Sequence, residues 1–393
     1  MLAPVGEFEG KATRFDALPG PDVRDAARNR HLPATGLTDV AHARGGAGSG
    51  KAVPASVGCR PGEMPLAGGA NRIVHVFPVG NVRPRMRVLV TGATGFVGGR
   101  LVAALLGDGH DVTVLMRDEE RYREEHPSEG VRVVEGDLLE PGRLGEAMDV
   151  EAAYYLVHSM RAGTDFAERD RRAARHFERA ASTAGVSRVI YLGGLGEERD
   201  HLSTHLRSRR EVEAILGEGT YDLTTLRAAI VIGAGSTSFD MIRQLAGRLP
   251  VMITPTWVRN ECQPIAIRDA IAYLTGVLDA PETAGGTYEI GGPEVLTYEE
   301  MLERTARLLG QRVRILPVPV LTPRLSAYWV DLVTDVPKSV AHPLILGLKN
   351  PVVVHDDAIT DHVDVAPTPF VEAVTAALAE YGYEVERSIP ETT

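Results

Sequence analysis

The chain has 393 residues, of which 44% are hydrophobic and 24% charged, a composition typical of a globular protein with one large core or two smaller ones. Its formal net charge of −11 is unevenly spread, because residues 1–85 carry 11 Lys and Arg against 7 Asp and Glu, which leaves −15 for the rest. The acidic main part argues against a nucleic-acid partner, which requires a basic face on the protein to neutralise its phosphates.

Residues 1–85 are rich in Gly, Ala, Pro and Arg and show no helical or alternating hydrophobic period. We expect this segment to be disordered. Met86 stands directly before the first convincing strand. This position suggests that the natural protein starts at Met86 and that the preceding segment is a misassigned extension of the reading frame.

The two cysteines, Cys59 and Cys262, lie in segments of different character and form no Cys-x-x-Cys pair. Neither a disulfide framework nor a metal site is therefore expected, and a reducing compartment is indicated. The sequence also contains no long apolar run of about eighteen residues and no basic segment followed by an apolar one at its start. We predict no transmembrane span, no secretory signal and a cytoplasmic location.

From residue 86 onward, short apolar runs alternate with amphipathic stretches. We expect strands near residues 87–90, 111–116, 131–135, 152–157, 188–192 and 223–226, and helices near 96–106, 268–278, 298–309 and 369–381. Continuous β-branched runs joined by helical segments indicate a parallel sheet that is covered on both faces. The predicted fold class is therefore α/β, with a doubly wound parallel sheet.

The first strand runs into glycines spaced as Gly-x-x-Gly-x-x-Gly, at the point where a helix opens. Gly92 permits a tight turn, Gly95 lets the backbone approach a pyrophosphate, and Gly98 lets the helix pack closely on the strand. Free N–H groups at the start of the helix would face the anion. This pattern predicts a Rossmann-type fold that binds NADP or NAD through Gly92, Thr94, Gly95, Phe96, Val97 and Gly98.

The end of the second strand indicates which of the two cofactors binds. An acidic residue there would bind the adenosine ribose, whereas an arginine would meet the 2′-phosphate of NADP. Arg117 stands at this position and favours NADP, although Asp118 would take the ribose role if the strand ended one residue later. Asp137 and Leu138, after the third strand, are placed to meet the adenine; alternatively, Asp137 caps the following turn.

Several strings make the chain similar to a known family. The glycine turn, residues 136–138 and residues 226–227 resemble the atypical and extended short-chain dehydrogenase/reductases, over about residues 86–350. The strings at 155–160, 205–209, 232–236 and 292–296 resemble a bacterial and archaeal subgroup often named as nucleoside-diphosphate-sugar epimerases, NAD(P)-binding or NmrA-like proteins. We expect an NAD(P)-binding core over 86–232 and a smaller substrate-binding, C-terminal helical region over 233–393, packed on the core.

The resemblance also implies where catalysis would occur. Family members place a Ser after the fifth strand and a Tyr-x-x-x-Lys pair on the next helix. Here Gly193 stands in place of the serine, and His205 and Arg209 occupy the positions of the pair. In one interpretation His205 donates a proton and Arg209 fixes the nicotinamide ribose. In the other, His205 caps an exposed helix and Arg209 belongs to a solvated face.

The loop after the fourth strand and two later segments would complete the site. Val157 and His158 are expected at the cofactor, and Ser159 beside the substrate. Trp257 and Arg259 would offer the substrate an aromatic plane next to a guanidinium. Two acidic residues near the start of the next long helix, Asp165 and Asp170, are expected to face solvent.

We therefore predict an NADP-dependent oxidoreductase or epimerase-like enzyme that exchanges hydride with a small carbonyl, quinone or nucleotide-sugar-like substrate. The alternative is an NAD(P)-binding protein with little or no catalysis: a redox sensor, a regulator, or an accessory or assembly protein of a respiratory complex. The missing Ser, Tyr and Lys favour the alternative. The apolar tail over 316–354 would cover the cleft or form a homodimer seam, and peripheral membrane contact is disfavoured because clustered Lys and Arg are sparse there.

Overall fold

The computed structural model describes residues 84–126, 130–159, 165–196, 203–318, 334–336, 340–341, 344 and 347–384. The chain divides into Met1–Val76 and Phe77–Thr393, and every described residue belongs to the second unit. Residues 1–83 lie outside the described residues, so the expectations for the N-terminal extension stay predictions. Cys59 and most of the apolar tail lie outside them too.

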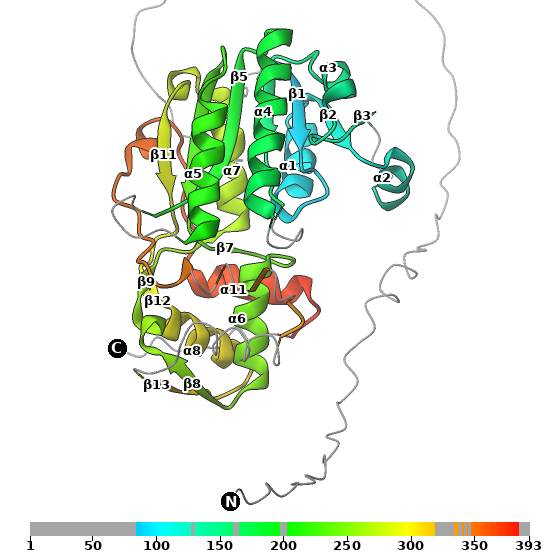
Figure 1. Cartoon of the computed structure of the whole chain (residues 1–393). Coiled ribbons are helices and arrows are strands. Elements are labelled where there is room, and N and C mark those ends of the chain that lie inside the picture. The colour runs from blue at the N-terminus through cyan, green and yellow to red at the C-terminus, as the bar shows by residue number, and fades with distance from the viewer. Residues whose placement is uncertain are drawn as a thin grey trace, which may run out of the picture. The chain divides into compact units, whose positions relative to one another are not determined.

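Seven parallel strands form the central sheet (Figure 1). They are β1 (Arg87–Thr91), β2 (Asp111–Met116), β3 (Val131–Glu135), β4 (Ala152–Tyr155), β5 (Arg188–Gly194), β6 (Asp222–Ala228) and β11 (Thr287–Ile290). Their order across the sheet is β11-β6-β5-β4-β1-β2-β3. The chain winds outward from β1 through β2 and β3, then returns to β4 and winds outward on the other side. This order confirms the predicted Rossmann-type, doubly wound fold, in which ligands bind where the direction reverses, at the carboxyl ends of β1 and β4.

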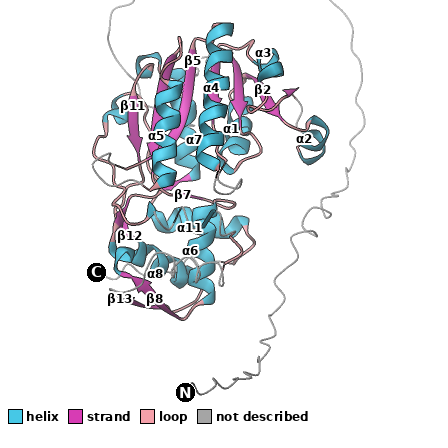
Figure 2. Ribbon diagram, in the orientation of Figure 1, coloured by secondary structure: helices cyan, strands magenta, loops and turns pink. Residues whose placement is uncertain are grey.

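Helices cover both faces of this sheet (Figure 2). One layer contains α1 (Phe96–Gly107) and α7 (Ile267–Asp279); the other contains α3 (Leu144–Ala147), α4 (Phe166–Ala184) and α5 (Thr204–Leu216). The fully buried side chains of β1 contribute to the core on both faces of the sheet. Val88 and Val90 pack with α1 and α7, and Leu89 packs with α3 and α4. Successive strand side chains point to opposite faces, so a continuous apolar run fits a sheet covered on both sides.

A smaller C-terminal lobe has a separate core. Its helices are α6 (Thr237–Arg248), α8 (Tyr298–Leu308) and α11 (Phe370–Glu380). Its two-stranded sheets pair β7 (Val231–Ile232) with β10 (Ile265–Ala266), β9 (Glu261–Cys262) with β12 (Leu296–Thr297), and β8 (Val251–Pro255) with β13 (Arg314–Val318). Short helical segments complete the described elements: α2 (Glu119–Glu125), η1 (Pro141–Arg143), η3 (Thr256–Arg259), η4 (Pro281–Thr283) and η5 (Ala358–Asp361).

The expected boundary at residue 232 does not separate core from lobe in space. After residue 232 the chain returns to the core, where α7 packs with α1 and β11 pairs in parallel with β6. The sequence pattern missed β11 because this short edge strand, Thr-Tyr-Glu-Ile, buries only its last residue and so lacks a continuous apolar run. None of the described helices is long and apolar enough to cross a bilayer.

Candidate functional site

The turn between β1 and α1 presents backbone to the crevice. Gly92 has a φ of +76°, and a Cβ there would lie 2.8 Å from the Leu156 carbonyl oxygen. A Cβ on Gly98 would collide with the Gly92 carbonyl. Both positions therefore require glycine, the first for its left-handed backbone and close approach, the second for close packing of α1 against the turn.

The N-terminus of α1 is suited to hold an anion. Its N-cap residue is Gly95, which has no side chain to accept hydrogen bonds from the first-turn N–H groups, and the first turn holds no acidic residue. These N–H groups and the positive end of the helix dipole favour a phosphate. The observed turn fits the pyrophosphate of a dinucleotide.

A cavity of about 1620 Å³ begins at this turn. Typical ligand pockets measure roughly 300–1,000 Å³, so this cavity has room for a dinucleotide and a second molecule. The predicted site residues that line it are Gly92, Thr94, Gly95, Phe96, Val97, Gly98, Arg117, Asp137, Leu138, Val157, His158, Ser159, His205, Arg209 and Trp257. The fold thus gathers residues that lie as much as 165 positions apart in the sequence, from Gly92 to Trp257, around one space.

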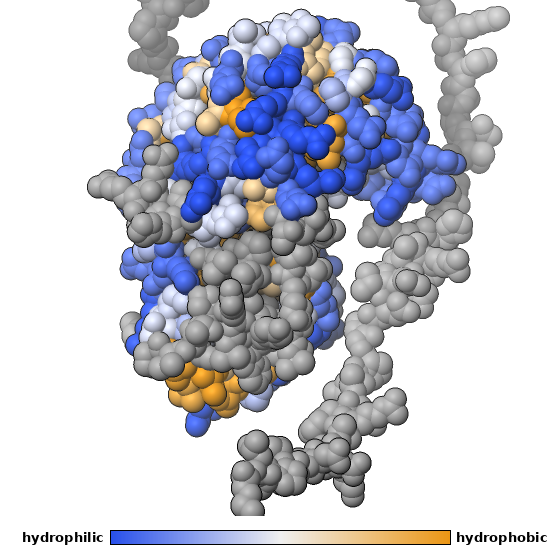
Figure 3. All heavy atoms as spheres, in the orientation of Figure 1, coloured by the Kyte–Doolittle hydropathy of each residue, from blue (hydrophilic) through white to orange (hydrophobic). Residues whose placement is uncertain are grey.

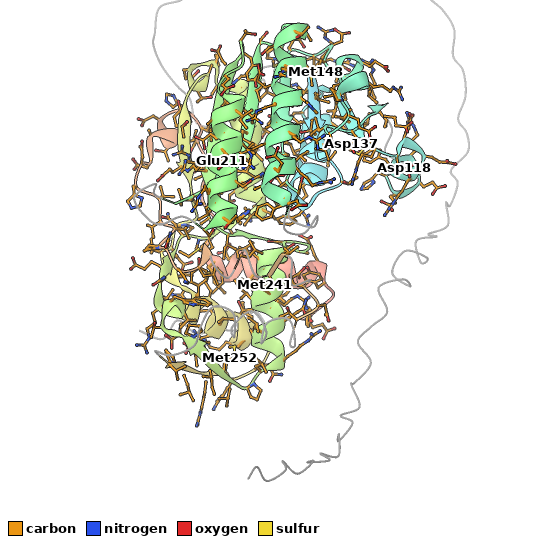
Figure 4. All side chains as sticks on the ribbon, viewed as in Figure 1. Asp118, Asp137, Met148, Glu211, Met241 and Met252 are labelled. Carbon is orange, nitrogen blue, oxygen red and sulfur yellow. The ribbon has the colours of Figure 1, made fainter. Side chains whose placement is uncertain are left out.

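The part of the cavity expected to hold the adenosine is lined by residues that follow β2 and β3, among them Asp118 and Asp137, which Figure 4 labels. Strand β2 ends at Met116, so exposed Arg117 is the first residue after it. The Asp118 carboxylate caps α2 by accepting from the Arg121 N–H at 2.9 Å, which ties it to the helix. Arg117 is therefore better placed than Asp118 to meet a group on the ribose.

Asp137 has a structural partner as well. Its Oδ1 accepts a hydrogen bond of 2.9 Å from the Leu139 N–H, which is the turn-capping role considered as the alternative. The Leu138 side chain is buried in the layer that contains α4, and its carbonyl oxygen lies 2.7 Å from His176 Nδ1. This turn is thus held in place by the core, with both Asp137 and Leu138 at the cavity wall.

The expectation that Asp170 faces solvent was wrong. Asp170 is 2% exposed, and its carboxylate accepts from the Ser159 N–H at 2.7 Å and from the Ser208 hydroxyl at 3.3 Å. It also lies 3.5 Å from the Arg209 guanidinium. The charge-rich sequence of α4 resembles a solvated helix, but one face of that helix packs against α5, and Asp170 lies on that face.

Arg209 is part of the same buried cluster rather than of a solvated face. It is 7% exposed, donates to the Val157 carbonyl oxygen at 3.2 Å and lies over the Tyr191 ring. Together, Arg209 and Asp170 hold both sides of the loop after β4, because one binds Val157 and the other Ser159. We call Asp170, Ser208 and Arg209, with the backbone of Val157 and Ser159, the loop clamp.

His205 lies in the first turn of α5 and lines the cavity. It does not cap the helix, because Ser203 is the N-cap and accepts from the Leu206 N–H at 3.3 Å. Burial, with smaller effects from the charges of Arg209 and His158, lowers the pKa of His205 to about 3. The imidazole is therefore neutral near pH 7.

Neighbouring side chains closely border Gly193, which stands at the position of the family's serine, and Gly194, which follows it. At the end of β5, a Cβ on Gly193 would lie 3.1 Å from a ring carbon of Tyr191, and a Cβ on Gly194 only 2.9 Å from a methyl carbon of Leu206. Glycine here leaves space for those side chains. At Gly193, the position of the family's serine, a Cβ would require the Tyr191 ring to move by a few tenths of an ångström.

Trp257 lines the cavity, but Arg259 does not. The Arg259 side chain is 66% exposed and pairs with Glu299 at 3.1 Å, so the expectation of a substrate-facing guanidinium beside Trp257 was wrong. Both residues lie in the 3₁₀ helix η3, where about three residues make a turn, so side chains two positions apart point to different sides. The indole Nε1 of Trp257 is buried without a hydrogen-bond partner in the described part of the chain.

The rest of the cavity is an apolar arm inside the C-terminal lobe. Met241 of α6, labelled in Figure 4, is one of its lining residues. The described apolar side chains of the arm are Met241, Ile242, Leu245, Leu249, Val251, Met252, Ile253, Trp257, Val258, Leu302, Val340, Leu344 and Leu348, and the polar side chains of Ser236, Thr237, Ser238, Thr254 and Tyr298 line the same part of the cavity. This arm carries no Lys or Arg among these lining residues.

One lining residue that the sequence did not single out is Arg169, in the first turn of α4. Its Nε is buried without a hydrogen-bond partner, and the described residues provide no carboxylate that pairs with it. An unpaired guanidinium at a cavity wall is available to an anion. Five of the six residues from Ala167 to Arg172 are charged. No signal in the sequence therefore distinguishes Arg169 from a solvated charge.

Comparison with known proteins agrees with this geometry. A family model described as NAD(P)H-binding matches residues 92–242. A (4-alkanoyl-5-oxo-2,5-dihydrofuran-3-yl)methyl phosphate reductase of Streptomyces griseus is 30% identical over 234 residues, covering 58% of this chain and 75% of that protein. A ceramide reductase of Caulobacter vibrioides is 29% identical over 237 residues, covering 59% and 73%. The triphenylmethane reductase of a Citrobacter species, solved with NADP(H), shares the fold with a TM-score of 0.60 at 18% identity, covering 74% of this chain and 99% of that one.

The nucleotide crevice and these relatives together define a dinucleotide-binding protein of the reductase and epimerase type. The chain belongs to the NAD(P)-binding short-chain dehydrogenase/reductase family and is related to its atypical reductases. The predicted family and NAD(P) cofactor are thereby confirmed.

Proposed function

We propose that the protein is an NADPH-dependent reductase of a carbonyl compound, or of an alkene conjugated to a carbonyl, that carries an extended apolar chain. The observation that carries this proposal is the single cavity, which joins the glycine turn to the apolar arm and passes His205 on the way. A redox reaction requires the cofactor and the substrate to meet, and the continuous cavity allows it. When bound, NADPH supplies the hydride.

His205 is the residue of this chain that meets the reacting oxygen. Because its pKa is lowered to about 3, it acts as a neutral N–H donor to the substrate oxygen rather than as an imidazolium acid. The carbon takes the hydride with its electron pair, and the oxygen takes a proton that comes from water through the His205 ring. A ketone gives the alcohol in this step. A conjugated alkene gives the enol, which tautomerises to the saturated carbonyl compound, and either product balances NADPH and one proton.

The loop clamp positions this chemistry. It fixes Val157 and Ser159 on either side of His158, and Arg209 connects them to the helix that carries His205. Arg209 is held by Asp170 and Val157, so its role is to position the loop and α5. The tyrosine and lysine of typical family members are thus replaced by a neutral histidine and a structural arginine.

The apolar arm favours a substrate with a hydrocarbon chain over a nucleotide sugar. The lining residues of the arm offer hydrocarbon to a substrate chain and include no Lys or Arg that would pair with the phosphates of a nucleoside diphosphate. Two of the reductases that the chain matches are named for an alkanoyl compound and for a ceramide; others are named for divinyl chlorophyllide a and 3-diazoavenalumate. The first two of these names support the same substrate class for this protein.

The cofactor of the proposed reaction is NADPH rather than NADH. Asp118 is held as the N-cap of α2, whereas Arg117 is not an N-cap. Arg117 lines the cavity, and so does Arg121, one helical turn further on. The Arg117 guanidinium would attract a 2′-phosphate, while that of Arg121 pairs with Glu125 at 2.8 Å.

The test follows NADPH absorbance with matched substrate pairs: 2-decanone against 2-butanone, and a decyl-substituted benzoquinone against the unsubstituted quinone. Each buried methylene contributes about 0.8 kcal/mol, so we expect kcat/KM to be at least about 100-fold higher for the long-chain member of a pair. UDP-glucose, as a nucleotide-sugar control, is expected to remain unchanged.

Two results would contradict the proposal. Epimerisation of UDP-glucose would assign the site to sugar chemistry. Tight NADPH binding without oxidation by any compound, and without any effect of His205→Gln, would favour a cofactor-binding sensor or accessory protein.

A further inference from the structure

The sheet of β8 and β13 has an exposed apolar face. Its strands run parallel, with Val251 beside Arg314 and Ile253 beside Leu316. Val251, Ile253 and Leu316 are 50%, 61% and 53% exposed, whereas Met252 is 4% exposed and belongs to the core of the lobe. Side chains alternate along a strand, so the exposed residues share the outer face. We call Val251, Ile253 and Leu316 the apolar face; Figure 3 shows an apolar surface at the end of the lobe where β8 and β13 lie.

Arginines border the apolar face. Arg314 lies two residues before Leu316 and shares its side of β13, and Arg312 precedes it at the same spacing. Both are exposed, and the described residues offer neither of them an ion pair. Neither β8 nor β13 contains an Asp or a Glu. This border is positively charged in a chain whose net charge is −11.

Two residues of the apolar face also belong to the lining of the cavity. Val251 and Ile253 line the cavity while half or more of each side chain remains exposed. From them the lining continues inward along the apolar arm through Leu249 and Met252 to Trp257. An apolar molecule would thus meet hydrocarbon from the surface to the interior.

We propose that the apolar face docks on an anionic lipid bilayer, so that the apolar arm opens toward the bilayer. The exposed side chains enter the boundary between headgroups and acyl chains, and Arg312 and Arg314 pair with anionic headgroups. A second copy of the chain fits this face less well. Pairing two copies of the face would bring their arginines together, and neither strand carries a carboxylate to neutralise them. Docking here places the end of the cavity in the phase from which an apolar-chain substrate is drawn.

Vesicle flotation of the full chain tests this proposal. We expect binding to vesicles of phosphatidylcholine mixed with phosphatidylglycerol, and weak binding to phosphatidylcholine alone. Ile253→Glu should lower the partition coefficient at least about ten-fold, because a carboxylate would have to enter the apolar boundary. Arg314→Gln should lower it about five-fold, on the anionic vesicles only. Val295→Glu changes a 45% exposed apolar residue elsewhere and is the matched control.

Thermal unfolding and NADPH affinity of each variant show whether the fold and the cofactor site are intact, and both are expected to remain unchanged. The proposal is overturned if the wild-type chain does not bind anionic vesicles, or if Ile253→Glu and Val295→Glu bind alike. It is also overturned if light scattering shows a dimer that Ile253→Glu dissociates, since the face would then be a self-association surface. Vesicle binding requires no turnover, so a negative result leaves the proposed reductase activity standing.

Discussion

Asp170 and Arg209, on different helices, form a buried ion pair at 3.5 Å directly behind the loop that follows β4. The pair connects α4 and α5 to the loop, because Asp170 accepts from the Ser159 N–H and Arg209 donates to the Val157 carbonyl oxygen. One pair of side chains therefore sets the position of His158 relative to His205. In a protein without the usual tyrosine and lysine, this pair maintains the shape of the proposed active site.

Asp170→Asn should destabilise the protein by about 3 kcal/mol, because it leaves the Arg209 charge buried without its partner. Urea unfolding measures the loss. Glu168→Gln, at an exposed ion pair on the same helix, is the control and should cost less than about 1 kcal/mol. In the double variant Asp170→Asn/Arg209→Met the loss should be smaller than the sum of the single losses. An equal loss of unfolding free energy in Asp170→Asn and in the control would show that the loop clamp contributes little to stability.

His205 makes stability depend on pH in a defined window. In the unfolded chain it binds a proton near pH 6.5, whereas in the folded chain burial holds its pKa at about 3. Its contribution to stability is therefore complete above pH 6.5 and is lost as the pH falls toward 3. On going from about pH 8 to about pH 5, the wild-type protein should lose up to about 2 kcal/mol more than His205→Gln does.

Urea unfolding of both proteins at the two pH values provides this comparison. If His205→Gln loses as much stability as the wild type, His205 titrates normally and can act as an imidazolium acid, contrary to the proposed mechanism.

Arg117→Gln should weaken NADPH binding about ten-fold, because a charge-assisted contact with the 2′-phosphate is lost. NADH binding should change less than about two-fold, since NADH has no phosphate at that position. Calorimetric titration of both nucleotides measures the difference. Arg123→Gln, on α2 but away from the cavity wall, is the matched control. A similar loss for both nucleotides would show that Arg117 does not select NADPH.

Arg169→Gln should leave the stability unchanged or raised, because it removes a partly buried guanidinium that has no carboxylate partner in the described structure. The same change should weaken NADPH binding at least about five-fold, since Arg169 is available to an anion in the cavity. Arg172→Gln, on the exposed side of α4, provides the comparison. NADPH affinity equal to that of Arg172→Gln would exclude Arg169 from the cofactor site.

The central fold could be predicted because its signals are local. The strands from β1 to β3 are short runs rich in Val and Leu, and the glycines of the turn are required by the backbone at Gly92 and by packing at Gly98. The edge strand β11 was missed because an edge strand does not need to be apolar on both faces. The cofactor, which depends on the same local turn, was predicted correctly.

The proposed active site was harder to predict because it depends on contacts between distant segments. In the sequence, Asp170 and Arg169 are adjacent charges in a helix of many charges, yet one is buried in the loop clamp and the other lines the cavity. Arg259 looked suitable beside Trp257, but the 3₁₀ turn directs it to Glu299. The apolar arm is formed by α6, β8 and Val340, Leu344 and Leu348, which no local pattern connects.

The most direct test of the reductase proposal uses NADPH deuterated at the transferable hydrogen of the nicotinamide, with 2-decanone as substrate. Mass spectrometry of the alcohol follows the label. Hydride transfer in the proposed cavity predicts deuterium on the carbinol carbon of the product, and a much slower reaction in His205→Gln. Unchanged ketone, or an alcohol without deuterium, would contradict the proposed function.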